Sequence, residues 1–419
     1  MTRQTMIMFA VSLSFFFVTA TTFTSLGFVL YTMIAELGWS QTAAGASFSL
    51  LGLSCGLSSP LPPLLMKWVG TRLTMTIGGL VLAAGFLLAS LVHGIGPFFA
   101  AMALLGTGFS LIAPSPAVFL IATWMPERYS RLVGYFFMAG ALGGVAGPLI
   151  VRTILGLTGS WRMHWAMMGV SALALALFLF ATIRDAVAVE STEQVKHAGH
   201  AAAPAPAPSP WTVRQALSSS TFLMIALAML VVQTVVTTIH SVLVAHVAGL
   251  GAGTAPGAWA MSMVALTGTV SKGITGRIAE RYDPRRLMVG GLVLTAAAMA
   301  MLCLTATPAW AIASAFVFGI GWGFAWLTAH LLLIRYFGTG IAGSLVAMAT
   351  MATTFAVLGP LSAGWVADAS GSFVPVFAAF AAMLGMAALT TALFLHAPRR
   401  RDAMDPPPVD QPALAVAAE

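Results

Sequence analysis

Charged residues are scarce in this chain. Only 7% of its 419 residues are charged, whereas 59% are hydrophobic, and soluble proteins have about 25% charged residues. This composition excludes a soluble globular protein. The net charge of +7 does not indicate a nucleic-acid partner, because the basic residues are scattered singly between apolar runs. We interpret them as markers of membrane topology.

Cysteine and chemical motifs are also sparse. Cys55 and Cys303 each lie in an apolar run, without the paired spacing of a disulfide framework or metal cluster. The sequence has no Gly-rich phosphate loop, nucleophile triad or metal-ligand cluster, so it favours neither an ATP-driven pump nor a membrane hydrolase. We therefore expect no enzymatic activity, no cofactor and no metal.

Long apolar runs fill most of the sequence. A membrane-crossing helix needs about 20 mostly apolar residues, and twelve runs meet this condition. The expected spans are 6–34, 42–66, 73–92, 97–123, 131–155, 163–183, 220–246, 256–279, 287–305, 308–334, 340–366 and 373–395. The first run is too long for the apolar part of a signal peptide. The sequence therefore predicts an all-α membrane protein embedded in a lipid bilayer.

Basic residues are distributed unevenly between the two sides of this bilayer. With the N-terminus in the cytoplasm, sixteen of the nineteen Lys and Arg residues lie inside. Arg152 and Arg162 lie outside, and Lys272 lies within a span. The positive-inside rule therefore predicts that both termini are cytoplasmic.

A polar segment divides the spans into two sets of six. Residues 201–210 read AAAPAPAPSP, a composition typical of an extended linker. Landmarks on either side repeat at a constant offset of 212, as Gly147-Pro148 and Gly359-Pro360 do. We therefore expect a duplicated fold with the substrate site between its halves. The expected parts are a six-helix bundle (1–183), a cytoplasmic linker (184–219), a second six-helix bundle (220–396) and a disordered cytoplasmic tail (397–419).

A charged motif follows the eighth span. Residues 276–286 read GRIAERYDPRR, which resembles the G-x-x-x-D-R-x-G-R-R loop motif of the major facilitator superfamily. The resemblance assigns a conformational role to Gly276, Arg277, Glu280, Arg281, Arg285 and Arg286. The equivalent segment of the first half, residues 63–72, has Lys67 in place of the motif's acid. The resemblance covers essentially the whole chain and implies two pseudo-symmetric six-helix bundles with alternating access.

Two further segments resemble the monocarboxylate transporter family and its oxalate/formate-exchanger relatives. One is Leu37-Gly38-Trp39-Ser40, and the other runs from Gly359-Pro360 to Asp368-x-Ser370-Gly371-Ser372-Phe373. The acidic Gly-Trp motif and the lysine that animal members carry in the first span are both absent. We therefore expect a bacterial inner-membrane member of this group, acting as a monomer.

Lys272 is the one basic residue that lies deep inside a predicted span, away from both of its ends. It precedes Arg281 by nine residues, which places it roughly 13 Å inside the cytoplasmic boundary. A lysine at that depth is costly and usually faces an aqueous cavity. All twelve acidic residues lie outside the predicted spans, so the natural partner of Lys272 is an anionic substrate. In the resembling family this position is an Arg, and the Asp one turn earlier corresponds to Gly268.

Other polar residues are candidates for the same site. Gln233, Thr237 and His240 share one face of the seventh span, and Trp322, Trp326 and His330 share a stripe of the tenth. In the fourth span, the resemblance places Ser115 at a substrate-site position, with Phe119 one turn beyond. Structural roles in packing or helix–helix hydrogen bonds are the alternative for each of them. Lys272 and His240 are the candidates for carrying a proton.

These observations favour a secondary transporter for a small monocarboxylate moved together with a proton. The alternatives are an organic-anion exchanger of the oxalate/formate type, a multidrug efflux antiporter, and a membrane-embedded sensor or scaffold that has kept the fold. The absence of acids within the spans argues against cationic drugs and against Na⁺ coupling.

Overall fold

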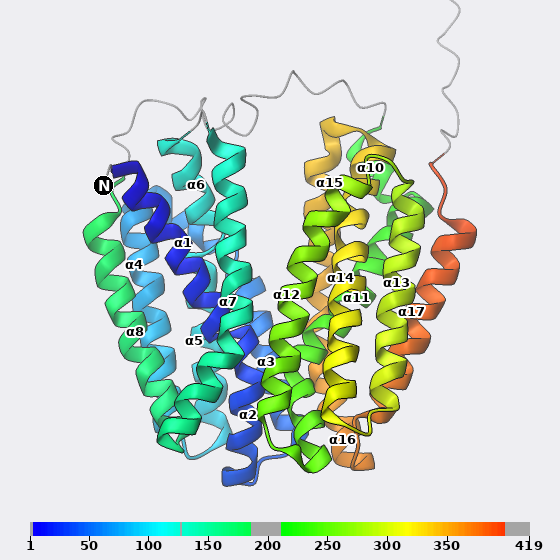
Figure 1. Cartoon of the computed structure of the whole chain (residues 1–419). Coiled ribbons are helices and arrows are strands. Elements are labelled where there is room, and N and C mark those ends of the chain that lie inside the picture. The colour runs from blue at the N-terminus through cyan, green and yellow to red at the C-terminus, as the bar shows by residue number, and fades with distance from the viewer. Residues whose placement is uncertain (1–2, 126–127, 186–210, 399–419) are drawn as a thin grey trace, which may run out of the picture.

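The computed structural model describes residues 3–125, 128–185 and 211–398, and Figure 1 shows the whole chain. The described residues form helices and turns and no β-strand, as the composition predicted. The first group of helices is α1 (Arg3–Thr21), α2 (Phe23–Leu37), α3 (Gln41–Leu57), α4 (Leu61–Leu91), α5 (Ile95–Ile112), α6 (Ser115–Trp124), α7 (Tyr129–Thr158) and α8 (Trp161–Thr182). The second group is α10 (Val213–Leu217), α11 (Ser220–Val247), η2 (Ala248–Ala252), α12 (Ala255–Ile278), α13 (Pro284–Cys303), α14 (Pro308–Phe337), α15 (Thr339–Ala352), η3 (Thr353–Val357), α16 (Leu358–Ser370) and α17 (Val374–Phe394).

Ten helical segments of the described chain are long and apolar enough to cross a membrane. The protein is therefore an all-helical, multi-pass membrane protein. Two of the twelve predicted spans are not among the ten. They correspond to α3, which has 17 residues, and to α12, which carries Lys272 and Arg277.

Several predicted spans are interrupted helices. Span 6–34 divides at Thr22, whose hydroxyl donates to the Val18 carbonyl, and span 97–123 divides at Pro114 between α5 and α6. Proline has no backbone N–H to continue a helix. The third interruption, in span 340–366, is the 3₁₀ segment η3 between α15 and α16. Such breaks free backbone carbonyls in the middle of a membrane protein.

The predicted boundary between the second and third spans was wrong. Residues 61–66 belong to α4 and not to the second span, because a turn at Ser58-Ser59-Pro60 ends α3 before them. Residues 63–72, the segment equivalent to the charged motif, are helical on either side of a kink at Gly70. Gly70 has a φ of 79°, a conformation that glycine adopts without a Cβ penalty.

The expected linker and tail are only partly described. The 201–210 run and residues 399–419 lie outside the described residues. Within 184–219, the end of the segment forms the short helix α10, which Thr212 and Gln215 cap reciprocally. We call the side on which α8 ends and α11 begins the linker side, and the opposite side the distal side.

The helices pack in two groups. In the first, α4 packs against α5 and α8, and α1 against α7; in the second, α14 packs against α12 and α13, and α13 against α17. The groups meet mainly through three helix pairs, α3 with α16, α7 with α12, and α2 with α11. In Figure 1 the groups contact each other toward the distal side and diverge toward the side of the N-terminus. The structure is thus closed on the distal side.

The two groups share structural details at the offset seen in the sequence. A Cβ on Gly147 would lie 2.3 Å from the Ala20 carbonyl oxygen of the first span. A Cβ on Gly359 would lie 2.4 Å from the Thr238 hydroxyl of the seventh span. Both glycines therefore allow close helix contact at corresponding places.

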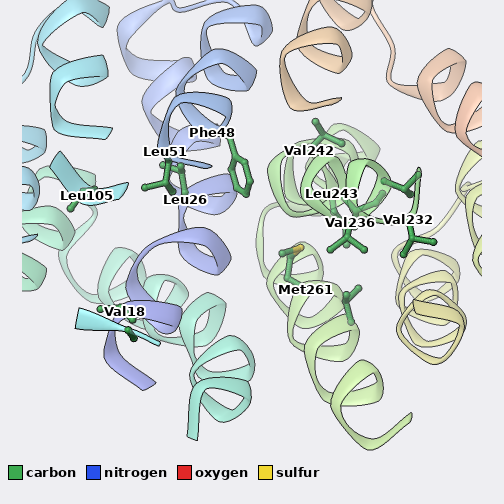
Figure 2. Packing of buried hydrophobic residues seen from close by; sticks show 14 of the residues in the cluster. Val18, Leu26, Phe48, Leu51, Leu105, Val232, Val236, Val242, Leu243 and Met261 are labelled. Carbon is green, nitrogen blue, oxygen red and sulfur yellow. The ribbon is translucent and has the colours of Figure 1, made fainter. Parts of the chain in front are cut away.

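Buried apolar side chains fill the interior of both groups. Figure 2 shows Val18, Leu26 and Leu51 in the first group, and Val236 and Met261 in the second. This packing fixes the helices that carry the polar candidates.

Candidate functional site

Lys272 lies against the aromatic ring of Trp322. Its Nζ is 3.7 Å from the ring centroid, although the two residues belong to different helices, α12 and α14. Both side chains are half-buried. Two ion pairs join described residues, Arg162 with Glu36 and Arg335 with Asp283, and neither involves Lys272. The closest partner of this cation is therefore an aromatic face, which attracts cations through its quadrupole.

Gly268 makes this contact possible. A Cβ at this position would lie 2.7 Å from Trp322 Cε3 and 2.9 Å from Cζ3. Gly268 is one helical turn before Lys272, at the position where the resembling family has an Asp. The indole thus occupies the space that a carboxylate would need, and the site keeps a positive charge without an acid.

His240 lies near this pair, and His330 lies eight residues beyond Trp322 on α14. The His240 and Trp322 rings are 6.4 Å apart, and the Trp326 and His330 rings are 5.2 Å apart. The Nδ1 atoms face backbone carbonyls one turn earlier, 2.8 Å from Val236 O for His240 and 2.7 Å from Trp326 O for His330.

The structure therefore brings together Lys272, Trp322 and His240, and it places Trp326 and His330 beside each other further along α14. No hydrogen bond among the described residues engages Nε2 of His240 or His330. One cation with imidazoles and indoles around it can bind a carboxylate and exchange a proton.

Gln233 and Thr237 lie on the same helix as His240 but have other surroundings. The Thr237 hydroxyl donates to the Gln233 carbonyl at 3.0 Å and to the Ala356 carbonyl at 3.2 Å. It thereby links α11 to η3. Across the described residues, neither side chain is hydrogen-bonded to Lys272.

Ser115 and Phe119 belong to the other group of helices. They lie on α6, which packs against α1, α4, α5 and α7. Ser115 is exposed at the start of α6, and Phe119 is half-buried. The structure does not place them in contact with Lys272, Trp322 or His240.

The charged motif after α12 connects helices on the linker side. Asp283 begins α13 by accepting a hydrogen bond from the Arg285 N–H at 3.2 Å, and it pairs with Arg335 of α14 at 3.7 Å. The Arg285 guanidinium donates to the Thr391 carbonyl at 3.3 Å and to the Ala392 carbonyl, at the end of α17. The motif therefore ties α12, α13, α14 and α17 together.

The first group has an equivalent arrangement in which a different acid takes part. Arg72 donates to the Phe180 carbonyl at 2.7 Å, in the role that Arg285 has in the second group. Asp185 accepts from the Arg72 N–H at 3.0 Å and from the Thr71 N–H. Sequence reasoning missed Asp185, which lies more than a hundred residues from the motif.

On the distal side, Asp368 joins the two groups. The Asp368 carboxylate accepts from the backbone N–H groups of Gln41 and Thr42, each at 2.8 Å, and from the Thr42 hydroxyl. It therefore caps the N-terminus of α3 from α16. Arg152 of α7 lies over the Trp259 ring of α12, 5.7 Å from its centroid. The sequence singled out Asp368 only as part of a resemblance and gave it no role.

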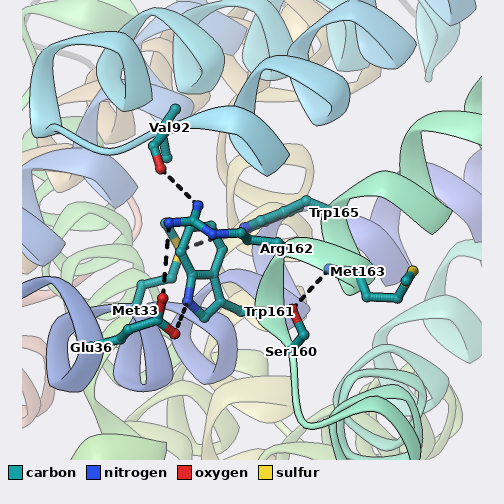
Figure 3. Close-up of polar contacts among 8 residues, drawn as sticks. All are labelled: Met33, Glu36, Val92, Ser160, Trp161, Arg162, Met163 and Trp165. Atoms are coloured by element: carbon teal, nitrogen blue, oxygen red, sulfur yellow. Dashed lines mark hydrogen bonds and ion pairs between the residues drawn. The ribbon is translucent and has the colours of Figure 1, made fainter.

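A second distal carboxylate, Glu36, acts within the first group. It accepts from Trp161 Nε1 at 2.7 Å and pairs with Arg162 at 3.8 Å, and Arg162 also donates to the Val92 carbonyl (Figure 3). These contacts hold α2 against α8.

Within the described residues, no group of three or more His, Cys, Asp or Glu side chains could hold a metal ion.

The chain is similar in sequence to known transporters. The uncharacterized transporter YycB of Bacillus subtilis (strain 168) is 25% identical over 387 residues, which cover 87% of this chain and 88% of that protein. Monocarboxylate transporter 13 of Rattus norvegicus is 24% identical over 331 residues, covering 78% and 74%.

Solved structures show the same fold. The crystal structure of a D-xylose-proton symporter has a TM-score of 0.73 at 15% identity and covers 94% of this chain and 98% of that one. A bacterial homolog to the human lysosomal transporter Spinster, in an inward-facing and occupied conformation, has a TM-score of 0.70 at 15% identity, with coverages of 93% and 94%.

A family model described as Major Facilitator Superfamily matches residues 11–357, which is most of the chain. The sequence relatives are named as transporters, and the structural likeness supports the same fold. The chain therefore belongs to the Major Facilitator Superfamily and is a membrane transporter.

Proposed function

We propose that this transporter is a bacterial inner-membrane secondary carrier that moves a small monocarboxylate together with a proton. The observation that carries the proposal is Lys272, a half-buried cation whose close partner is the Trp322 ring and not a carboxylate. A cation without an acidic partner in a membrane span favours an anion as its ligand. The similarity to monocarboxylate transporter 13 supports the same class of substrate.

The mechanism proposed is alternating access between the bundles 1–183 and 220–396. In this assignment α3 and α12 complete a set of twelve spans, and the linker side is cytoplasmic because sixteen of nineteen basic residues belong there. The distal contacts of Asp368 and Arg152 then close the outer side, and the structure is inward-facing. A monomer contains both bundles and the site between them.

Lys272, His240 and His330 would bind the substrate carboxylate. Lys272 supplies the charge, while His240 of α11 and His330 of α14 offer ring nitrogens whose Nδ1 partners are backbone carbonyls. Gln233, Thr237, Ser115, Phe119 and Trp326 are proposed as further lining residues. A proton can travel on Lys272, on His240 or on the carboxylate itself, because no acid lies in a predicted span.

Uptake into proteoliposomes tests this function. We expect radiolabelled monocarboxylate to enter wild-type vesicles faster under an inward proton gradient. Lys272→Ala should abolish uptake because it removes the cation. Lys272→Arg should retain part of the uptake because Arg keeps a cation at this position. Wild-type uptake by the Ala variant would reject Lys272 as the anion anchor.

Organic-anion exchange is the second candidate, and the same absence of membrane acids favours it. A fixed lysine balanced only by its substrate is neutral when loaded and charged when empty, which favours return with a second anion. Uptake that ignores the proton gradient but increases with anion trapped inside the vesicles would select the exchanger.

A further inference from the structure

The empty site contains a charge that the loaded site does not. With a carboxylate bound, the Lys272 ammonium is paired, whereas without it the ammonium has no acidic partner among the described residues. A secondary carrier must reorient empty in order to give net transport, but in exchange it reorients loaded in both directions. An unpaired charge is costly in the occluded state, where water is excluded. Something in the protein must reduce this cost if net transport is to be efficient.

The Trp322 ring is placed to do so. Its face lies 3.7 Å from Lys272 Nζ, a distance at which a desolvated cation–π contact is strong. The ring comes from α14 and the cation from α12, so the contact lies between two packed helices of the same bundle. Rigid movement of that bundle would carry both partners together and preserve the contact.

Two features indicate that the face of the ring, and not its N–H, determines this placement. Trp322 Nε1 is buried and has no hydrogen-bond partner among the described residues, a cost that a packing residue such as Phe would avoid. Gly268 leaves just enough room for the ring edge, since a Cβ there would come within 2.7 Å of it. Indole is also the aromatic group that binds cations best.

We propose that the face of the Trp322 ring stabilises the Lys272 ammonium in the empty transporter, in place of the substrate carboxylate. This cation–π contact allows the empty site to reorient. The inference rests on the proposed function, because it assumes that Lys272 binds the anion and that the proton travels on the carboxylate or on His240 while Lys272 stays protonated. Trp322 is therefore a positioning residue that acts on the return of the empty carrier.

The test compares net uptake with exchange in the same proteoliposomes, with lactate as the probe. Net uptake starts with anion-free vesicles, and exchange starts with vesicles loaded with unlabelled lactate. Trp322→Leu is expected to slow net uptake roughly ten-fold, the effect of losing a partly desolvated cation–π contact. Exchange should change by less than about two-fold, because both of its steps use the loaded carrier. Trp322→Phe keeps an aromatic face and should lie between Leu and wild type.

A matched glycine pair controls for folding and packing. Gly268→Ala should displace the indole and reproduce the selective loss of net uptake. Gly273→Ala, five residues further along α12 and next to Lys272, should have no effect, because a Cβ there meets nothing within 4 Å. If Trp322→Leu does not fold, the glycine pair decides the question.

The outcomes separate this inference from the proposed function. Equal loss of net uptake and exchange in Trp322→Leu or Gly268→Ala, or no loss in either assay, overturns the role of Trp322. Loss of both activities in Lys272→Ala alone leaves the proposed function standing. Undiminished net uptake and exchange in Lys272→Ala overturns the proposed function itself.

Discussion

Replacing Asp368 with Asn is expected to shift the transporter away from the conformation described above. In the distally closed structure the Asp368 carboxylate of α16 accepts three hydrogen bonds at the start of α3, from Gln41 and Thr42. The residues lie on opposite sides of the contact between the two helix groups. These bonds must break when the distal side opens, so they stabilise one state only.

The size of the shift follows from what Asn keeps. Asn retains one acceptor oxygen and loses the negative charge at the helix N-terminus. A hydrogen bond to a charged group contributes about 1.5–3 kcal/mol, and the charge–helix interaction about 0.3–1 kcal/mol. Asp368 is exposed, so solvent screening argues for the low end. A loss of about 1–2 kcal/mol corresponds to a five- to thirty-fold change in the ratio of the two states.

Double electron–electron resonance measures this ratio. Spin labels at His93→Cys and Ala306→Cys would report the separation of the two groups, because both positions are exposed at distal helix ends. The native Cys55 and Cys303 would be replaced by Ser in this background. The Asp368→Asn variant should show a larger population with a long distance between the labels.

Glu36→Gln is the matched control. Glu36 is also a distal carboxylate, but its contacts with Trp161 and Arg162 stay within one helix group. Its substitution should leave the distance distribution unchanged. An unchanged distance distribution in Asp368→Asn, or the same shift in both variants, would refute the claim that Asp368 stabilises the distally closed state.

Three further predictions concern transport and topology. Lys272→Ala should abolish monocarboxylate uptake without loss of folded protein on size-exclusion chromatography, because it removes an unpaired half-buried charge and leaves no acid unpaired. An unfolded variant would contradict this. His240→Ala should slow uptake without uncoupling it, so that an inward pH gradient still accelerates uptake in proteoliposomes; loss of the gradient effect would make His240 the proton carrier. Reporters fused in the 184–219 segment and at the C-terminus should both show cytoplasmic activity, and a periplasmic signal at either site would reject the topology.

The fold was largely predictable because it follows from composition and periodicity. Apolar runs separated by charges predicted helices in every described span, and the repeat of Gly147 at Gly359 corresponds to matching close helix contacts. Helix ends were harder to predict. The apolar residues 61–66 look like a continuation of the second span, yet the turn at Ser58-Ser59-Pro60 assigns them to the next helix.

The site was only partly predictable because its contacts join distant segments. Lys272 stood out as a charge in an apolar run, but its contact with Trp322 depends on how α12 crosses α14. The absence of a side chain at Gly268 was visible in the sequence, whereas the ring that fills this space was not. Asp368 and Thr42 are 326 residues apart, and no local pattern predicts such a contact.

The claim that Lys272 binds the substrate carboxylate is tested most directly by thermal unfolding of the purified protein. The ligands are lactate, pyruvate, longer and aromatic monocarboxylates, and dicarboxylates, measured on wild type, Lys272→Ala and Lys272→Arg. A ligand at about 100 times its Kd stabilises the native state by about 2.7 kcal/mol. The account predicts that at least one monocarboxylate raises the Tm of wild type by a few degrees, raises that of the Arg variant less, and leaves the Ala variant unchanged. The same Tm increase in Lys272→Ala as in wild type would contradict it.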